Sequence, residues 1–161
     1  MIDLGNGLTL ERATDADLEY VHEHLRPGDM VEHTFDTTKA DRVKNLPGVM
    51  VVKYREAIIG YIGHMPPPME TVFSKARVVY YLSTVHADSC KLTYVKRTPE
   101  VLRAVVGTMP GWVEDILTVS MPEAYPMACK WLEKVLGFKR LVDFKWRGGV
   151  HRLYRKERKE V

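Results

Sequence analysis

Alternating and continuous runs of apolar residues along the chain predict seven β-strands. They lie at residues 8–13, 49–54, 57–64, 78–85, 116–120, 141–146 and 150–154. Only Arg55 and Glu56 separate the second strand from the third, so these two strands are expected to form a hairpin.

Apolar residues at helical spacing predict four helices. The first begins at Thr14, whose hydroxyl caps it with Asp17 in a capping-box position. A second covers residues 38–46, and a third is expected to begin at Thr98 with Pro99 in its first turn. The fourth covers residues 124–136 and ends at Gly137. Residues 91–95 suit a short strand or an extended loop.

The resulting element order, β-α-α-β-β-β-α-β-α-β-β, predicts an α/β fold. We expect a mixed, mainly antiparallel central sheet flanked by helices. The 161 residues form a single domain on the usual size rule, and 45% hydrophobic with 28% charged residues is typical of a globular chain. No apolar run is long enough to span a membrane, and acidic residues in the first twenty positions argue against a signal peptide. Two cysteines make no disulfide framework, so a reducing compartment, the cytoplasm, is expected.

Charge is distributed unevenly along the chain. Residues 1–36 carry nine acids and two bases, a net −7, whereas residues 139–161 carry nine bases and three acids, a net +6. The overall net charge of +3 is too small to argue for nucleic acid. The basic end, interpreted as a tail from about residue 152, can meet a phosphate-bearing ligand or an acidic partner. The alternative is that both ends are solvated surface.

Two segments of the chain resemble the GNAT N-acyltransferase superfamily. Residues 8–18 (LTLERATDADL) are similar to the opening strand and helix of that family, and residues 128–138 (ACKWLEKVLGF) to its late helix, which typically ends in Lys-Leu-Gly-Phe. The resemblance implies a GNAT-like fold and transfer of an acetyl group from acetyl-CoA to the amine of a small molecule or protein. The stretch 80–138 also resembles short GNAT-like proteins of tailed phages, some described as internal virion proteins, which would place the chain in the host cytoplasm or the virion.

The segment that would hold the coenzyme departs from the family pattern. The family's pyrophosphate loop, Arg/Gln-x-x-Gly-x-Gly/Ala, is absent, and residues 64–106 contain no glycine. Four residues are the candidates for phosphate contacts in its place: Lys91, Lys96, Arg97 and the predicted helix start at Thr98. Pro99 removes a helix donor and Glu100 adds an acid there, so solvated lysines on a loop are the alternative.

The late helix also departs from the family. Pro126 and Glu133 stand where relatives often carry an Asn and a Tyr. Tyr125 is the candidate acid for protonating the leaving thiolate, and Glu123 is the candidate base for the amine. Both residue types also suit a helix start without any catalytic role.

Other chemistry has weaker support in the sequence. The six histidines lack the spacing of a zinc site, so no metal is expected. Cys90 with His86 has no third member for a nucleophilic triad, so a small buried or half-buried thiol is the favoured interpretation. Three functions therefore remain: an N-acyltransferase with an altered coenzyme loop, an inactive GNAT-like module that binds a protein, and a nucleic-acid contact by the basic end. Edge strands can also pair two copies as a homodimer.

Overall fold

The computed structural model describes residues 1–27, 48–67, 72–146 and 148–161. The helix expected at residues 38–46 lies outside them. The strands are β1 (Ile2–Gly5), β2 (Leu8–Arg12), β3 (Met50–Tyr54), β4 (Ala57–Met65), β5 (Ala76–Ser83), β6 (Asp115–Ser120), β7 (Lys139–Trp146) and β8 (Gly149–Glu157). The helices are α1 (Asp15–Glu23), α4 (Lys91–Gly107) and α5 (Pro126–Lys134), with short 3₁₀ turns η1 (Val85–Cys90) and η2 (Arg158–Glu160).

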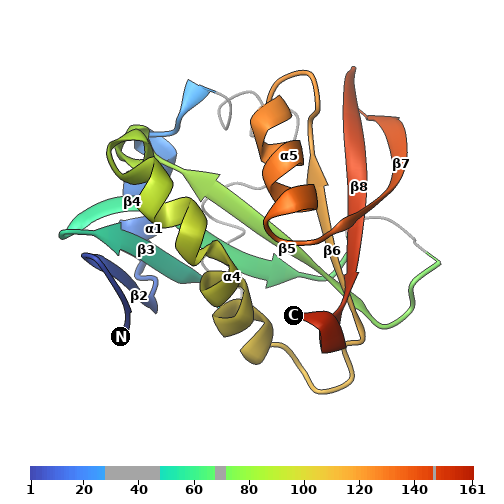
Figure 1. Ribbon diagram of the computed structural model, residues 1–161, viewed down its shortest axis with the longest axis horizontal. Helices are drawn as coiled ribbons and strands as arrows, with labels where there is room; N and C mark the ends of the chain where they lie inside the picture. Colours follow the sequence, from blue (N-terminus) through green and yellow to red (C-terminus); the bar gives the residue numbers. More distant parts are fainter. Residues whose placement is uncertain (28–47, 68–71, 147) are drawn as a thin grey trace.

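The eight strands form one sheet in the order β1-β2-β3-β4-β5-β6-β8-β7. Every neighbouring pair is antiparallel except β5 with β6, which run parallel. Helix α1 packs on one face, where its Leu18 and Val21 meet Tyr61 and Leu82, and α4 and α5 cover the other (Figure 1). The α/β class, the mixed sheet and its helical layers are thus confirmed.

Local signals at the first helix and the central hairpin are confirmed in detail. The Thr14 hydroxyl accepts from the Asp17 amide at 3.2 Å while the Asp17 carboxylate accepts from the Thr14 amide at 2.9 Å, which completes the capping box. The hairpin of β3 and β4 turns through Arg55 and Glu56, both with positive φ. Two positive φ values in a two-residue loop match the right-handed twist of the flanking strands.

The prediction that the third helix begins at Thr98 is wrong, as is the extended segment at residues 91–95. Helix α4 begins at Lys91 and runs through Pro99. Proline has no N–H for the carbonyl four residues earlier, that of Val95. The Thr98 hydroxyl donates to this carbonyl at 2.8 Å, so the helix continues because a side chain supplies the missing donor.

The two chain ends also differ from the sequence expectation. An unpredicted first strand, β1, pairs with β2 across a turn in which Asn6 has φ 55°. The basic tail expected from about residue 152 is wrong, because β8 continues to Glu157 between β6 and β7. Beyond it, the Arg158 guanidinium donates to carbonyls at the C-terminal end of α4, those of Val106 at 3.1 Å and Pro110 at 2.6 Å among them. These basic residues are therefore part of the folded domain.

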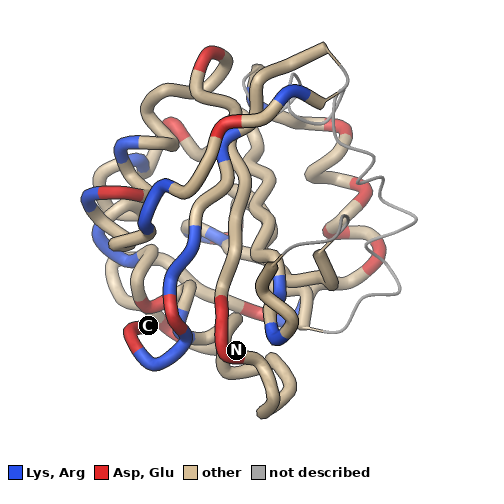
Figure 2. Tube along the Cα trace, turned by 90° about the vertical axis from the view of Figure 1, so that its right-hand side faces the viewer, with Lys and Arg blue, Asp and Glu red and all other residues tan. Residues whose placement is uncertain are grey.

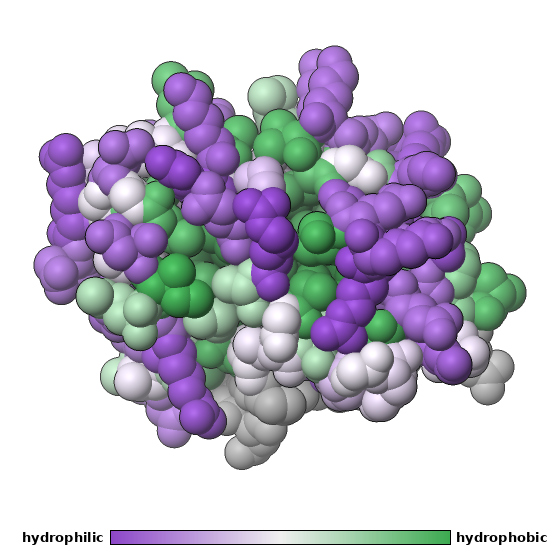
Figure 3. All heavy atoms as spheres, turned by 60° about the horizontal axis from the view of Figure 1, so that its bottom comes forward, coloured by the Kyte–Doolittle hydropathy of each residue, from purple (hydrophilic) through white to green (hydrophobic). Residues whose placement is uncertain are grey.

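Charged positions are distributed unevenly over the fold. In Figure 2 acidic positions follow α1, whereas Lys and Arg positions gather along β7 and β8. On the face in Figure 3, areas of hydrophobic surface lie between hydrophilic side chains. Edge strand β7 is largely exposed, with exposed fractions of 43% for Leu141 and 51% for Val142.

Candidate functional site

The two parallel strands at the middle of the sheet separate towards their C-terminal ends. β5 and β6 pair only from Ala76 with Asp115 to Val78 with Leu117. At the next pair of residues, the Thr118 hydroxyl donates to the Val79 carbonyl at 2.9 Å, in place of a backbone hydrogen bond between the strands. Beyond that point β6 pairs with β8 alone, so the sheet has a V-shaped opening between β5 and β6.

A short segment after α1 closes the far end of this opening. The Arg26 amide donates to the Ser83 carbonyl at 3.0 Å, and the Val85 amide donates to the His24 carbonyl at 2.9 Å. Backbone groups in a strand alternate in direction, and the Val79 and Ser83 carbonyls both point away from β4. Tyr81 lies midway between Val79 and Ser83 in the strand, so its backbone amide and carbonyl also point away from β4. The Tyr81 backbone therefore faces the side of β5 on which the opening lies.

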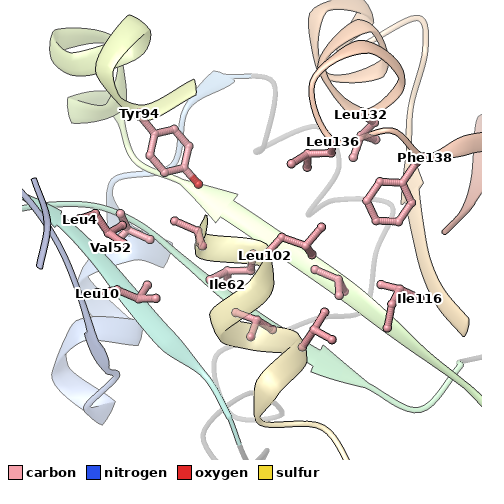
Figure 4. Close-up of a cluster of buried hydrophobic side chains, with 14 of the residues drawn as sticks. Leu4, Leu10, Val52, Ile62, Tyr94, Leu102, Ile116, Leu132, Leu136 and Phe138 are labelled. Carbon is pink, nitrogen blue, oxygen red and sulfur yellow. The ribbon is translucent and has the colours of Figure 1, made fainter. Parts of the chain in front are cut away.

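A cavity of about 40 Å³ lies beneath α4 and α5 at the base of the opening. A water molecule occupies about 10–15 Å³ on this scale, so the cavity has room for about three water-sized groups. Its walls come from β4, β5, β6 and both helices: Ile62, Val79, Tyr81, Tyr94, Thr98, Val101, Leu102, Thr118, Trp131, Leu132, Leu136 and Phe138. Figure 4 shows Tyr94 directed from α4 towards β5, with Leu132, Leu136 and Phe138 on the opposite side.

A hydrogen-bond chain connects the two helices across this cavity. Trp131 Nε1 on α5 donates to Thr98 Oγ1 on α4 at 2.9 Å, and that hydroxyl donates onward to the Val95 carbonyl. The Tyr81 and Tyr94 rings stack beside it with centroids 5.6 Å apart. Bulky aromatic side chains therefore line the opening, and the cavity described above is the space that remains between them.

Cationic and aromatic side chains lie around the upper end of the opening, which is the end beside the segment after α1. The Arg26 guanidinium lies over the Tyr125 ring, 4.9 Å from its centroid, so it links the segment after α1 to the start of α5. Tyr20 Oη and His86 Nε2 share a hydrogen bond of 2.8 Å, and His24 stacks on Tyr20 with centroids 4.0 Å apart. Imidazole and phenol groups therefore lie next to the C-terminal end of β5.

The four residues proposed to hold the coenzyme do not form one surface. Lys91 is the first residue of α4, and Lys96 and Arg97 follow five and six residues later. At 100° per residue, these positions point about 140° and 120° away from Lys91. Arg97 is also paired with Glu100 at 2.8 Å, and Thr98 is buried in the core. Of the four, Lys91 is the one at a helix N-terminus.

The two residues proposed for catalysis lie together between β6 and α5. Glu123 is exposed in the turn that follows β6, and Tyr125 is the N-cap residue of α5. Tyr125 is half-buried beside Arg26. The structure thus places both residues near the upper end of the opening.

Sequence reasoning missed three residues that shape the opening: Tyr81, Thr118 and Trp131. Tyr81 and Thr118 lie within strands predicted from their β-branched and aromatic content, which gives no signal for where two strands separate. Trp131 belongs to the apolar side of a predicted helix, and nothing local identifies its partner. The Thr98-Pro99 pair is also compatible with a continuous helix in which a threonine hydroxyl supplies the donor that proline lacks. The same pair suits a helix start, so the sequence does not distinguish the two.

A second polar network lies under the C-terminal end of α4. Arg77 Nε donates to His64 Nδ1 at 3.1 Å, so His64 carries its proton on Nε2 and donates to Thr108 Oγ1 at 3.1 Å. Burial lowers the pKa of His64 to about 4, with the positive charges of Arg77 and Arg158 adding to the effect. This imidazole is therefore neutral at physiological pH and serves as a fixed hydrogen-bond relay.

In the part of the chain that the structure describes, no group of three or more His, Cys, Asp or Glu side chains is placed to hold a metal ion. None of the described helices is long and apolar enough to cross a membrane.

Comparison with known proteins finds solved structures of the same fold. No family model matches the chain, and no curated protein matches it in sequence. Among solved structures, the aminoglycoside acetyltransferase AAC(6')-Ib with coenzyme A superposes at a TM-score of 0.67 with 19% identity, covering 94% of this chain and 95% of that one. A GNAT superfamily phosphinothricin acetyltransferase from Sinorhizobium meliloti with acetyl-CoA gives 0.65 with 17% identity, covering 94% and 88%. Spermidine N-acetyltransferase from Vibrio cholerae with CoA and spermine gives 0.63 with 13% identity, covering 96% and 98%. These likenesses establish a GNAT-like fold.

Proposed function

We propose that the protein is an acyl-CoA-dependent N-acyltransferase that transfers an acyl group, acetyl in the simplest case, to an amine. The observation that carries the proposal is the V-shaped opening between β5 and β6, which lies beneath two helices. The structures with this fold compared above were solved with acetyl-CoA or coenzyme A, and two of them act on aminoglycosides and spermidine. An amine-bearing small molecule or protein is the corresponding acceptor here.

The chain's own residues supply the groups that this reaction requires. An extended thioester arm would lie in the opening between β5 and β6, and a backbone N–H donor there would stabilise negative charge on the thioester oxygen. Lys91 at the start of α4 is the first of the proposed phosphate contacts, with Lys96, Arg97 and Thr98 as the others. Glu123 is the proposed base and Tyr125 the proposed acid.

A thermal-shift titration tests coenzyme binding without knowledge of the acceptor. Acetyl-CoA at one hundred times its dissociation constant is expected to stabilise the fold by about 2.7 kcal/mol. Release of free thiol from acetyl-CoA in the presence of spermidine or an aminoglycoside then tests turnover. The absence of any shift at millimolar acetyl-CoA contradicts the proposal.

A second function is favoured by the bond that connects α4 and α5. The Trp131–Thr98 hydrogen bond spans the two helices, and residues 64–106 lack the glycines that let a backbone approach phosphate closely. We therefore keep the alternative of an inactive GNAT-like module that docks on a protein, such as a phage virion component. Catalytic release of thiol contradicts this alternative.

A further inference from the structure

The cavity at the base of the β5–β6 opening has chemistry that selects its occupant. Ten of the twelve residues that line it contribute aliphatic or aromatic surface, and the two others are Thr98 and Thr118. Both threonine hydroxyls donate to backbone carbonyls, those of Val95 and Val79. Neither threonine proton is thus available to a ligand, and the Trp131 N–H donates to Thr98. The hydroxyls of Tyr81 and Tyr94 are the other polar side-chain atoms of the lining residues, so most of the wall is hydrocarbon and suits an apolar group.

The cavity also lies where the end of a thioester arm would reach. Val79 and Thr118 mark the point at which the strands separate. Val101 and Leu102 belong to the turn of α4 that follows Thr98, and Ile62 lies on the neighbouring strand β4. The cavity therefore extends from the opening into the core.

We infer that this cavity is an acyl pocket and that the preferred donor carries an acyl chain longer than acetyl, of the propionyl or butyryl class. The inference rests on the proposed acyltransferase function. The methyl group of an acetyl thioester fills about one of the three water-sized spaces, and two more methylenes fill the rest. In the reaction the amine nitrogen bonds to the thioester carbonyl carbon and the carbon–sulfur bond breaks. The ammonium loses one proton to the base, and a second nitrogen proton passes to the coenzyme thiolate.

The test measures dissociation constants of the full chain by calorimetry for coenzyme A and for acetyl-, propionyl-, butyryl- and octanoyl-CoA, with no acceptor present. Burial of two methylenes is expected to tighten binding about tenfold from acetyl- to butyryl-CoA. Octanoyl-CoA is expected to bind more weakly than butyryl-CoA because its chain exceeds the cavity. An equal affinity for all thioesters, or the tightest binding for acetyl- or octanoyl-CoA, overturns the pocket while the proposed function stands.

Two matched variants locate the effect. Val101→Ile adds one methylene to a wall of the cavity, whereas Val105→Ile adds one to the next turn of α4, where a fully buried valine lies outside the cavity lining. Val101→Ile is expected to raise the melting temperature and to remove the preference for butyryl-CoA while acetyl-CoA still binds. Val105→Ile is expected to lower the melting temperature and keep the preference. Val79→Ile is a second filling variant should Val101→Ile fold poorly, and a preference unchanged in the filling variant overturns the pocket. If neither coenzyme A nor any thioester binds the wild type, the proposed function and the pocket both fall.

Discussion

Trp131 Nε1 and Thr98 Oγ1, 2.9 Å apart, join the two helices that cover one face of the sheet. The same hydroxyl satisfies the Val95 carbonyl that Pro99 deprives of its helical donor. The Thr98 side chain thus keeps α4 continuous and fixes its spacing from α5.

Thr98→Val is expected to lower the free energy of unfolding by about 2–3 kcal/mol, because it leaves the Trp131 N–H and the Val95 carbonyl buried without partners. Thr98→Ser keeps the hydroxyl and is expected to cost about 1 kcal/mol or less. Urea unfolding of the two variants measures the difference. Equal losses for Val and Ser would show that the methyl group matters and the hydroxyl does not.

His64 makes the stability of the fold depend on pH. Its folded-state pKa of about 4 lies below the ordinary value of 6.5, so the unfolded chain binds the proton more readily. Stability is complete above pH 6.5 and is lost as the pH falls towards 4, with a loss of about 2 kcal/mol expected between pH 7.5 and pH 5. His64→Gln, compared with the wild type by urea unfolding at both pH values, is expected to remove this part of the pH dependence. An unchanged slope in the variant contradicts the assignment.

The C-terminal residues are predicted to stabilise the fold. Arg158 donates to four backbone carbonyls, at Val106, Met109, Pro110 and Val113. Arg158→Ala is expected to cost about 1.5–3 kcal/mol, the usual range for hydrogen bonds from a charged group. Lys159→Ala, at an exposed neighbouring position, is expected to change stability by less than about 0.5 kcal/mol. Similar melting temperatures for the two variants would contradict a stabilising role of the Arg158 hydrogen bonds.

Phosphate binding by α4 is predicted to depend on position as well as charge. Lys91→Ala removes the cation at the start of the helix and is expected to weaken coenzyme A binding about tenfold or more. The double variant Lys96→Ala/Arg97→Ala loses more charge but is expected to change the affinity much less, because those side chains point away from Lys91. Calorimetry with coenzyme A measures both. A larger effect from the double variant would place the phosphates on another face of α4.

Tyr125 is predicted to act through its hydroxyl. Tyr125→Phe keeps the ring on which Arg26 stacks, and the dissociation constant of coenzyme A measured for the variant is the control for an intact binding site. Loss of a general acid is expected to lower kcat about 10²–10⁴-fold. Thiol release with a working acceptor measures kcat, and full activity in the variant would leave Tyr125 with a packing role.

Residues near one another in sequence determined a large part of this structure. The two-residue connection at Arg55 and Glu56 predicts the central hairpin, and Thr14 with Asp17 predicts the start of α1. The late helix is shorter than expected: α5 ends at Lys134 with Val135 as its C-cap, and Gly137, with φ 72°, lies in the turn that follows. Such signals depend on groups a few residues apart, so a single sequence contains them in full.

Tertiary structure decided where α4 begins and where the sheet opens. Thr98 and Pro99 locally favour a helix start, but α4 continues through them because the Thr98 hydroxyl serves the Val95 carbonyl and is itself held by Trp131, 33 residues away. The opening depends on Val79 and Thr118, 39 residues apart, at the point where a side chain replaces the ladder of backbone bonds. These features arise from contacts between distant segments, and local propensity has no term for such contacts.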